Sequence, residues 1–185
     1  PLEVGAAAVA ITPTCFERFL DCGEDGVCPD NPAWVESDAG EGDAEWDKQT
    51  EAFEDCGCDR ICPGDDGYPG PDEGEEDGEF NALWLAGFQT GRPVNEVHDD
   101  LWARTIAFRK GDTTVAIVSM DVFGYFFDDV QEARALIAAS GTDVDHVVIS
   151  STHNHEGPDT LGQYGLQIGK RGVNCLLYTS PSPRD

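Results

Sequence analysis

Hydrophobic positions along this chain fall into two blocks separated by a long stretch without a pattern. Residues 4–11 are small and apolar and predict a buried central strand, which Thr12 and Pro13 end. Residues 101–109 and 113–120 predict two further strands, joined by a hairpin turn at 110–112. Gly, Pro, Asp and Cys dominate residues 15–79, so we expect a loop-rich insertion held by cross-links rather than by a core.

The second block continues with a helix and another strand. Residues 126–139 carry apolar side chains at three- and four-residue steps, with Asp128 and Asp129 in the first turn and Gly141 after the end, which predicts an amphipathic helix. Residues 145–151 contain a β-branched run that is typical of a strand buried between two layers. Strand, helix and strand in this order predict a parallel crossover. The expected fold class is therefore α/β, a mixed sheet with flanking helices that carries a disulfide-bonded acidic insertion.

The net charge of −26 is concentrated in the insertion. Residues 15–79 hold 23 Asp and Glu against three basic residues, a net charge of −20. Such a segment repels nucleic acid and anionic lipid and attracts cations, so we expect no nucleic-acid partner. The chain has no apolar run long enough to cross a bilayer and begins almost directly on a strand-like run, so we expect neither a transmembrane segment nor a signal peptide within it.

Six of the seven cysteines also lie in the insertion. An even number in a segment without a core predicts three disulfides, with the pairing left open, and an oxidising compartment such as the periplasm, the cell surface or the exterior. The alternative is a zinc knuckle of thiolates, although the spacings miss the Cys-x2-Cys pattern of such sites. The six cysteines are Cys15, Cys22, Cys28, Cys56, Cys58 and Cys62.

Carboxylates alternate with glycines in two parts of the insertion, residues 38–47 and 65–79. Calcium prefers six to eight hard oxygen ligands on a flexible loop, so these segments are candidate calcium sites, although neither fits the EF-hand pattern. The alternative is a solvated acidic loop. The candidate ligands are Asp38, Asp43, Asp47, Asp72 and Asp77.

Two histidines follow the last predicted strand. If the backbone stays extended over residues 152–156, His153 and His155 project to the same side, because side chains alternate along a strand. Two imidazoles facing one cavity indicate a metal site, with zinc as the natural candidate, but the pair supplies at most half of a tetrahedral shell. Two solvated loop histidines are the alternative.

The segment Ser-Thr-His-Asn-His-Glu-Gly-Pro at 151–158, followed by Gly-Gln-Tyr-Gly at 162–165, resembles the Thr-His-Thr-His-Ser-Gly-Pro signature of the neutral/alkaline ceramidase family. Members of that family are zinc amidases that hydrolyse the N-acyl bond of ceramide. The chain departs from the signature at Asn154 and Glu156. The resemblance extends to residues 1–14 and about 80–170, and does not cover the segment between them.

The resemblance implies a role for each histidine of the pair. It makes His153 a zinc ligand and His155 a catalytic residue in the active site, and it places a second His, a Glu and a Tyr ligand downstream of this chain. Asp121 is expected at the same carboxyl edge of the sheet, where it either orients an imidazole or only forms a turn. His98 is expected to be a surface or structurally bonded residue, and His146 a structural one.

The expected domains follow the same division of the chain. Residues 1–14 and 80–174 form the N-terminal part of a ceramidase-like catalytic domain, and residues 15–79 form the insertion. Residues 175–185 resemble translated sequencing-adapter DNA and are expected to be a non-native tail, with a native disordered tail as the alternative. This fragment is expected to be inactive by itself.

The expected function is zinc-dependent hydrolysis of the amide bond of a lipid-like N-acyl substrate. One alternative is a related metal-dependent hydrolase of another N-acyl or ester substrate, since a fold does not fix a substrate. The other is a non-catalytic, calcium-binding surface module. The oligomeric state is left open.

Overall fold

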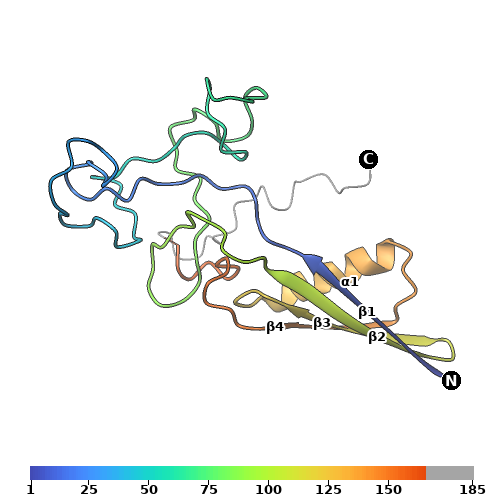
Figure 1. Ribbon diagram of the computed structural model, residues 1–185. Helices are drawn as coiled ribbons and strands as arrows, with labels where there is room; N and C mark the ends of the chain where they lie inside the picture. Colours follow the sequence, from blue (N-terminus) through green and yellow to red (C-terminus); the bar gives the residue numbers. More distant parts are fainter. Residues whose placement is uncertain (166–185) are drawn as a thin grey trace.

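The computed structural model describes residues 1–165, and they form one four-stranded mixed sheet with one helix (Figure 1). The strand order is β1-β2-β3-β4, in which β1, β2 and β3 pair antiparallel and β4 pairs parallel to β3. The predicted mixed sheet is confirmed, but the expectation of several flanking helices is wrong within residues 1–165. The elements are β1 (Leu2–Ala10), β2 (Trp102–Lys110), β3 (Thr113–Met120), α1 (Phe127–Ala139) and β4 (His146–Ser151).

Local sequence signals explain the ends of these elements. Gly111 turns the β2–β3 hairpin with φ +62°, a conformation that costs glycine little. The N–H of Phe126 donates to Asp129 Oδ2 at 2.9 Å at the start of α1, and Gly141 follows its end with φ +72°. The predicted hairpin and helix are therefore confirmed.

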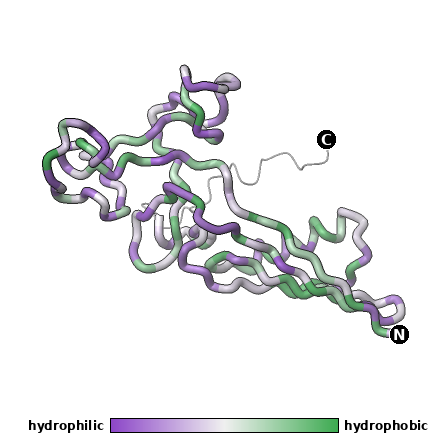
Figure 2. The backbone as a smooth tube through the Cα atoms, viewed as in Figure 1, coloured by the Kyte–Doolittle hydropathy of each residue, from purple (hydrophilic) through white to green (hydrophobic). Residues whose placement is uncertain are grey.

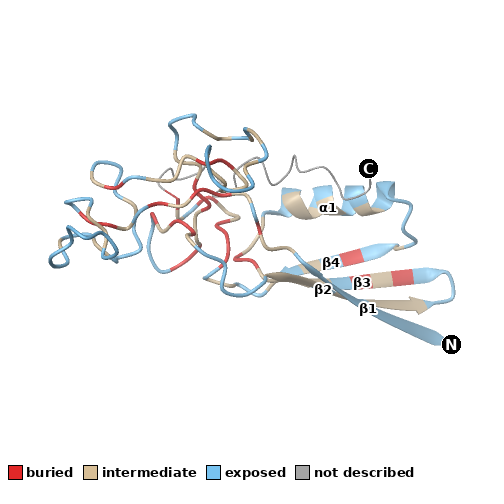
Figure 3. Cartoon of the chain, turned by 45° about the horizontal axis from the view of Figure 1, so that its top comes forward, coloured by how far each residue is buried: buried red, intermediate tan, exposed pale blue. Residues whose placement is uncertain are grey.

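The sheet is covered on one face only. Val147 faces α1 and is 8% exposed, whereas Ile106, Ile117 and Val148 lie in one row on the opposite face and are 48%, 45% and 51% exposed. Figure 2 shows these strands as an apolar region of the chain, and Figure 3 shows α1 on one side of them. The prediction that the fourth strand is buried between two layers is wrong, because residues 1–165 supply no second layer.

The prediction of a buried central strand over residues 4–11 is also wrong. β1 pairs only with β2 and lies at the edge of the sheet, and all nine of its residues are exposed. Small apolar side chains suit a central strand, but they also suit an edge strand that nothing covers. Composition alone therefore did not distinguish the two positions.

The buried core of the molecule lies beside the sheet, among the loops (Figure 3). Phe16, Leu83 and Val94 are 1%, 2% and 7% exposed and pack together. They come from the start of the insertion and from the segment after it. This core therefore anchors the insertion to the segment that precedes β2.

The insertion contains three disulfides and no helix or strand longer than an isolated bridge. The predicted disulfides are confirmed, so the cysteines do not form a zinc knuckle. Cross-links are not the only contacts that hold the insertion. Phe80, which directly follows it, packs against Trp46 and Phe53 within it at ring-centroid distances of 4.5 and 5.3 Å, and against Trp84 at 6.2 Å. The disulfides are Cys15–Cys58, Cys22–Cys28 and Cys56–Cys62. The expectations for residues 175–185 lie outside the described residues.

Candidate functional site

The candidate site lies where the parallel strands β3 and β4 end. Their pairing continues into the loops that follow, because the N–H of Thr152 donates to Met120 O at 2.9 Å and the N–H of Asn154 donates to Val122 O at 3.3 Å. The residue between these two donors, His153, is thereby held beside Phe123. The predicted strand–helix–strand crossover therefore brings these two loops together at the carboxyl edge of the sheet.

The backbone at His153 is left-handed, with φ +61°, so the extended conformation over residues 152–156 that strand alternation requires is not present. Such a conformation costs a non-glycine residue on the order of 1 kcal/mol and persists only where surrounding contacts hold it. Two contacts do so: the ring stacks on Phe123 at 4.4 Å, and His153 Nδ1 lies 3.0 Å from the carbonyl oxygen of Phe123.

The bond to Phe123 fixes the tautomer of a neutral His153. A carbonyl oxygen only accepts hydrogen bonds, so Nδ1 carries the hydrogen and Nε2 carries the lone pair. A backbone carbonyl bonded to one ring nitrogen is the usual arrangement behind a histidine that binds metal through the other. The neutral ring is therefore in the form that a metal ligand requires.

His155 lies next to His153 despite the turned backbone. The two ring centroids are 4.7 Å apart in an edge-to-face arrangement, and His155 also meets the rings of Phe88 and Phe123 at 5.7 and 5.1 Å. Gly87 makes room for it, because a Cβ at that position would lie 2.2 Å from His155 Nδ1. The two predicted site histidines are thus adjacent, through tertiary contacts rather than strand alternation.

A third segment, residues 84–87, closes this side of the site. The N–H of Ala86 donates to Gly157 O at 2.9 Å, and the N–H of Asp159 donates to Trp84 O at 2.8 Å. Asp159 is fully buried, and its Oδ2 accepts the N–H of Tyr164 at 2.6 Å. Asp159 therefore holds the loop that follows the histidine pair, which is a structural role.

The two departures from the ceramidase signature have local partners. Glu156 Oε2 accepts a bond from Arg92 at 3.0 Å, and the Arg92 guanidinium lies 5.4 Å from the ring centre of Phe88. Asn154 Oδ1 accepts the N–H of Glu156 at 2.9 Å and closes a short turn. Both substitutions therefore support the shape of the loop.

A cavity of about 470 Å³ lies next to the histidine pair. Its apolar wall includes Phe16, Leu83 and Val94, and its polar wall includes Asp121 and Glu156. Within residues 1–165 neither His153 nor His155 contributes to this wall. Glu96, His98, Asp99 and Asp100 also line it, so the cavity has one apolar and one acidic side. The loop after β4 separates this cavity from the aromatic-lined imidazole pair.

The structure places Asp121 at the predicted edge but bonds it to β2. Its Oδ2 accepts the N–H of Trp102 at 3.1 Å and the guanidinium of Arg104 at 2.6 Å. Within the described part of the chain, no hydrogen bond joins Asp121 to an imidazole. A catalytic role for Asp121 stays a prediction.

The other two histidines lie on the surface, which was expected for His98, whereas His146 was expected to be structural. His98 is 97% exposed in its side chain and bonds through Nδ1 to Asp99 at 2.7 Å. That bond and the charge of Asp99 raise the pKa of His98. His146 is exposed at the start of β4, at the opposite edge of the sheet from the histidine pair.

The five candidate calcium ligands each bind backbone within the insertion. Each carboxylate accepts at least one backbone N–H. Asp38 accepts that of Asp25, Asp43 that of Glu45, Asp47 that of Gln49, Asp72 those of Cys58 and Asp59, and Asp77 that of Glu79. Across residues 1–165 no group of three or more His, Cys, Asp or Glu side chains is arranged to hold a metal ion. The described chain therefore offers an imidazole pair but no complete metal shell.

Sequence reasoning missed three residues that shape the site. Phe123 carries the carbonyl that orients His153, Gly87 admits His155, and Arg92 pairs with Glu156. A positive-φ glycine is sometimes visible as a Gly between apolar residues, as at Ala86-Gly87-Phe88. The other two contacts join segments far apart in sequence and leave no local signal.

No family model, curated protein or solved structure matches this chain. No helix within residues 1–165 has the length and apolar character to span a bilayer.

Proposed function

We propose that this chain contributes the first part of a zinc-dependent amidohydrolase of the ceramidase type, acting on an N-acyl lipid. The observation that carries the proposal is the imidazole pair at the carboxyl edge of the sheet, with ring centroids 4.7 Å apart and His153 Nδ1 engaged by the Phe123 carbonyl. The likeness of residues 151–158 to the family signature supports it.

His153 would hold zinc through Nε2, the ring nitrogen that carries the lone pair. Zinc supplies a water of lowered pKa and polarises the amide carbonyl. The stacked ring of Phe123 and the bond to its carbonyl keep His153 from rotating. One protein ligand does not complete a zinc shell, so the chain by itself is expected to bind zinc weakly.

His155 would move a proton or steady negative charge on the carbonyl oxygen. Its ring nitrogens make no hydrogen bond to other residues within 1–165, so they stay available for a reacting group. A neutral His155 accepts a proton, and a protonated His155 donates a hydrogen bond to a developing oxyanion. The apolar wall of the cavity beside the loop, formed by Phe16, Leu83 and Val94, would receive an acyl or alkyl chain.

The experiment compares His153→Ala with His155→Ala in the full-length gene product. We expect His153→Ala to lose both zinc and N-acyl-sphingosine hydrolysis, and His155→Ala to lose hydrolysis while keeping most of its zinc. His146→Ala is the matched control, because His146 is exposed at the opposite edge of the sheet. Zinc content is measured by elemental analysis.

Two outcomes would contradict the proposal. Equal zinc loss in both variants would mean that the two rings chelate jointly, which overturns the division of roles. Full hydrolysis in both would remove the catalytic role of the pair. A related ester hydrolase would be recognised by turnover of an O-acyl substrate with the same dependence on both histidines.

A further inference from the structure

The open face of the sheet, on the side of the strands away from α1, is apolar across all four strands. Paired residues of neighbouring strands project to the same side, so Leu2 and Val4 of β1 share this face with Ile106, Ile117 and Val148. The two β1 side chains are 60% and 62% exposed. A contiguous apolar surface of this kind marks an interaction site.

The area of the open face limits the contacts that it can support. β1 has nine residues and β4 has six, so a sheet of four strands forms a face roughly 25 Å long and 19 Å wide. Two such faces packed together would remove about 1,000 Å² from water, which is the lower limit for a specific interface. The face is therefore large enough for a weak dimer of two copies.

The charge of the open face also suits a second copy. No strand position on this face carries a carboxylate, although the chain holds 37 Asp and Glu. Arg104 and Lys110 are its only Arg and Lys, and Arg104 is already paired with Asp121 at 2.6 Å. Depletion of charged residues at the centre is typical of protein–protein interfaces.

The two ends of the open face carry opposite charges. Lys110 is exposed at the hairpin end of β2. Asp100 is exposed just before the other end of β2, and its Oδ1 accepts the hydroxyl of Thr12 at 2.8 Å, which continues the β1–β2 register onto the same face. Two copies packed face to face with antiparallel strands therefore bring Lys110 of each copy over Asp100 of the other.

The acidic insertion favours the same arrangement. It carries a net charge of −20 and follows β1, at the opposite end of the sheet from the N-terminus (Figure 1). Antiparallel packing places the two insertions at opposite ends of the dimer, roughly 25 Å or more apart, which exceeds the screening length of about 8 Å at physiological ionic strength. Parallel packing would bring the two insertions together at one end.

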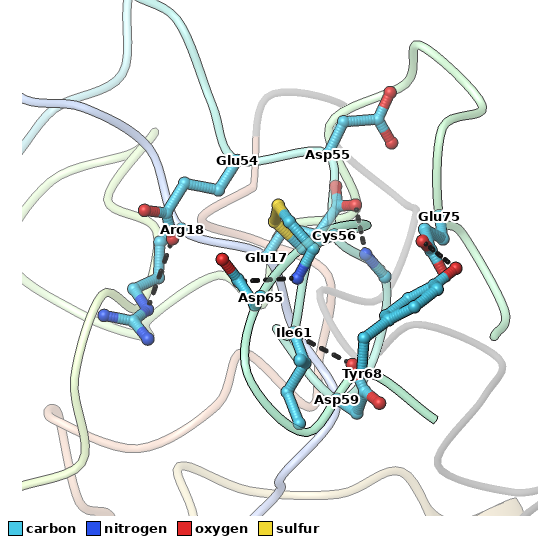
Figure 4. Close-up of a disulfide and its surroundings, with 12 residues drawn as sticks. Glu17, Arg18, Glu54, Asp55, Cys56, Asp59, Ile61, Asp65, Tyr68 and Glu75 are labelled. Atoms are coloured by element: carbon cyan, nitrogen blue, oxygen red, sulfur yellow. Dashed lines mark hydrogen bonds and ion pairs between the residues drawn. A yellow bond between two sulfur atoms is a disulfide. The ribbon is translucent and has the colours of Figure 1, made fainter. Parts of the chain in front are cut away.

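The insertion is held in place at its end of the sheet. Figure 4 shows Glu17, at the start of the insertion, beside the Cys56–Cys62 disulfide. Glu17 is 1% exposed and accepts the N–H groups of Gly57 and Asn81 at 3.1 and 2.7 Å. These bonds join the start of the insertion to its second half and to the segment that follows it, so its charge stays at this end.

We propose that two copies of this chain associate through the open face of the sheet, with their strands antiparallel about a twofold axis. The apolar rows that contain Ile106, Ile117 and Val148 face each other across the axis, as in two aligned sheets. Lys110 and Asp100 pair at both ends of the interface. Because the area is at the lower limit, the dissociation constant is on the order of 100 µM, and below that concentration the face stays open.

The test is sedimentation velocity of the oxidised chain between about 10 µM and about 1 mM. We expect monomer at the lower concentration and dimer at the higher one, with association weakened at least about tenfold by Ile117→Lys and by Val148→Lys. Leu136→Lys is the matched control, because Leu136 is 65% exposed but lies on α1, and it should leave association within about twofold.

Charge exchange tests the antiparallel arrangement. Lys110→Glu should weaken association by about threefold or more, and adding Asp100→Lys should restore it. Lys48→Glu makes the same change in net charge within the insertion and should have a smaller effect than Lys110→Glu. If a lysine on the open face prevents folding, Lys110→Glu and Lys48→Glu still decide the result, because both residues are exposed.

Five outcomes would overturn the proposal. They are a chain that stays monomeric at the highest concentration, growth into larger aggregates without a dimer, equal weakening by Leu136→Lys and Ile117→Lys, equal weakening by Lys48→Glu and Lys110→Glu, or binding to phosphatidylcholine vesicles in place of dimer formation. The last would assign the open face to a lipid surface. None of these measurements depends on zinc or on amide hydrolysis.

Discussion

At the scale of single residues, the candidate site depends on two left-handed backbone positions. His153 has φ +61° and is held there by the stack and the bond to Phe123. Gly87 has φ +84°, and its missing side chain leaves the space in which the His155 ring lies. The relative position of the two imidazoles therefore rests on one strained histidine and one glycine from another segment.

Gly87→Ala should displace His155 while leaving His153 in place. The added Cβ would lie 2.2 Å from Nδ1 and 2.5 Å from Cγ of His155, which no real contact permits. The change should also cost about 1 kcal/mol in backbone strain. The measurement is the imidazole NMR spectrum, in which the His155 signals should shift strongly.

Gly111→Ala is the control for Gly87→Ala, because it introduces the same kind of backbone strain without a steric clash. Gly111 has φ +62°, and a Cβ there would meet nothing within 4 Å. This variant should lose about 1 kcal/mol of stability through backbone strain alone, without moving the His155 signals. Unchanged His155 signals in Gly87→Ala would show that Gly87 does not position the ring.

At the scale of elements, the single helix makes the two faces of the sheet unequal. Val147 and Val148 are neighbours on β4 with the same side chain, yet they are 8% and 51% exposed. Apolar burial, rather than β propensity, should therefore separate the effects of substituting them.

Val147→Ala should lower the free energy of unfolding by about 2 kcal/mol, because it removes a buried side chain from beneath α1. Val148→Ala should stay within about 0.5 kcal/mol, as for other exposed positions. Urea unfolding followed by circular dichroism measures both. A loss at Val148 equal to that at Val147 would mean that the open face is covered in solution.

At the scale of the whole molecule, the three disulfides close loops of very different length. Cys15–Cys58 spans 43 residues, whereas Cys22–Cys28 and Cys56–Cys62 each span 6. The first also joins the entry of the insertion to its second half. It should therefore restrict the unfolded chain more than the other two.

Removing Cys15–Cys58 by paired Cys→Ala changes should cost about 4 kcal/mol in the chain-entropy model, against about 2 kcal/mol for Cys22–Cys28. Guanidinium unfolding of the two double variants measures the difference. Equal losses, or a larger loss for the six-residue loop, would show that native contacts rather than loop closure dominate.

Several features of the fold could be predicted from sequence because their physical causes are local. The hairpin at Gly111 follows from turn chemistry, and α1 follows from apolar periodicity with acids in its first turn. The disulfides followed from an even cysteine count in an acidic loop segment. Residues 19–28 and 53–62 also align in the sequence at an offset of 34, which is far longer than the periods that define helices and strands.

Only the tertiary structure decided which faces are covered and which side chains meet. The exposure of β1 and Val148 depends on whether a second layer is present, and composition carries no information about that. The two-residue spacing of His153 and His155 predicted that their rings would lie together, because side chains alternate along an extended strand. The backbone at His153 is left-handed, so that reason does not apply. Their contact comes from Phe123 and Gly87, which are adjacent to them in space and distant in sequence, and long-range packing of that kind leaves no periodic trace.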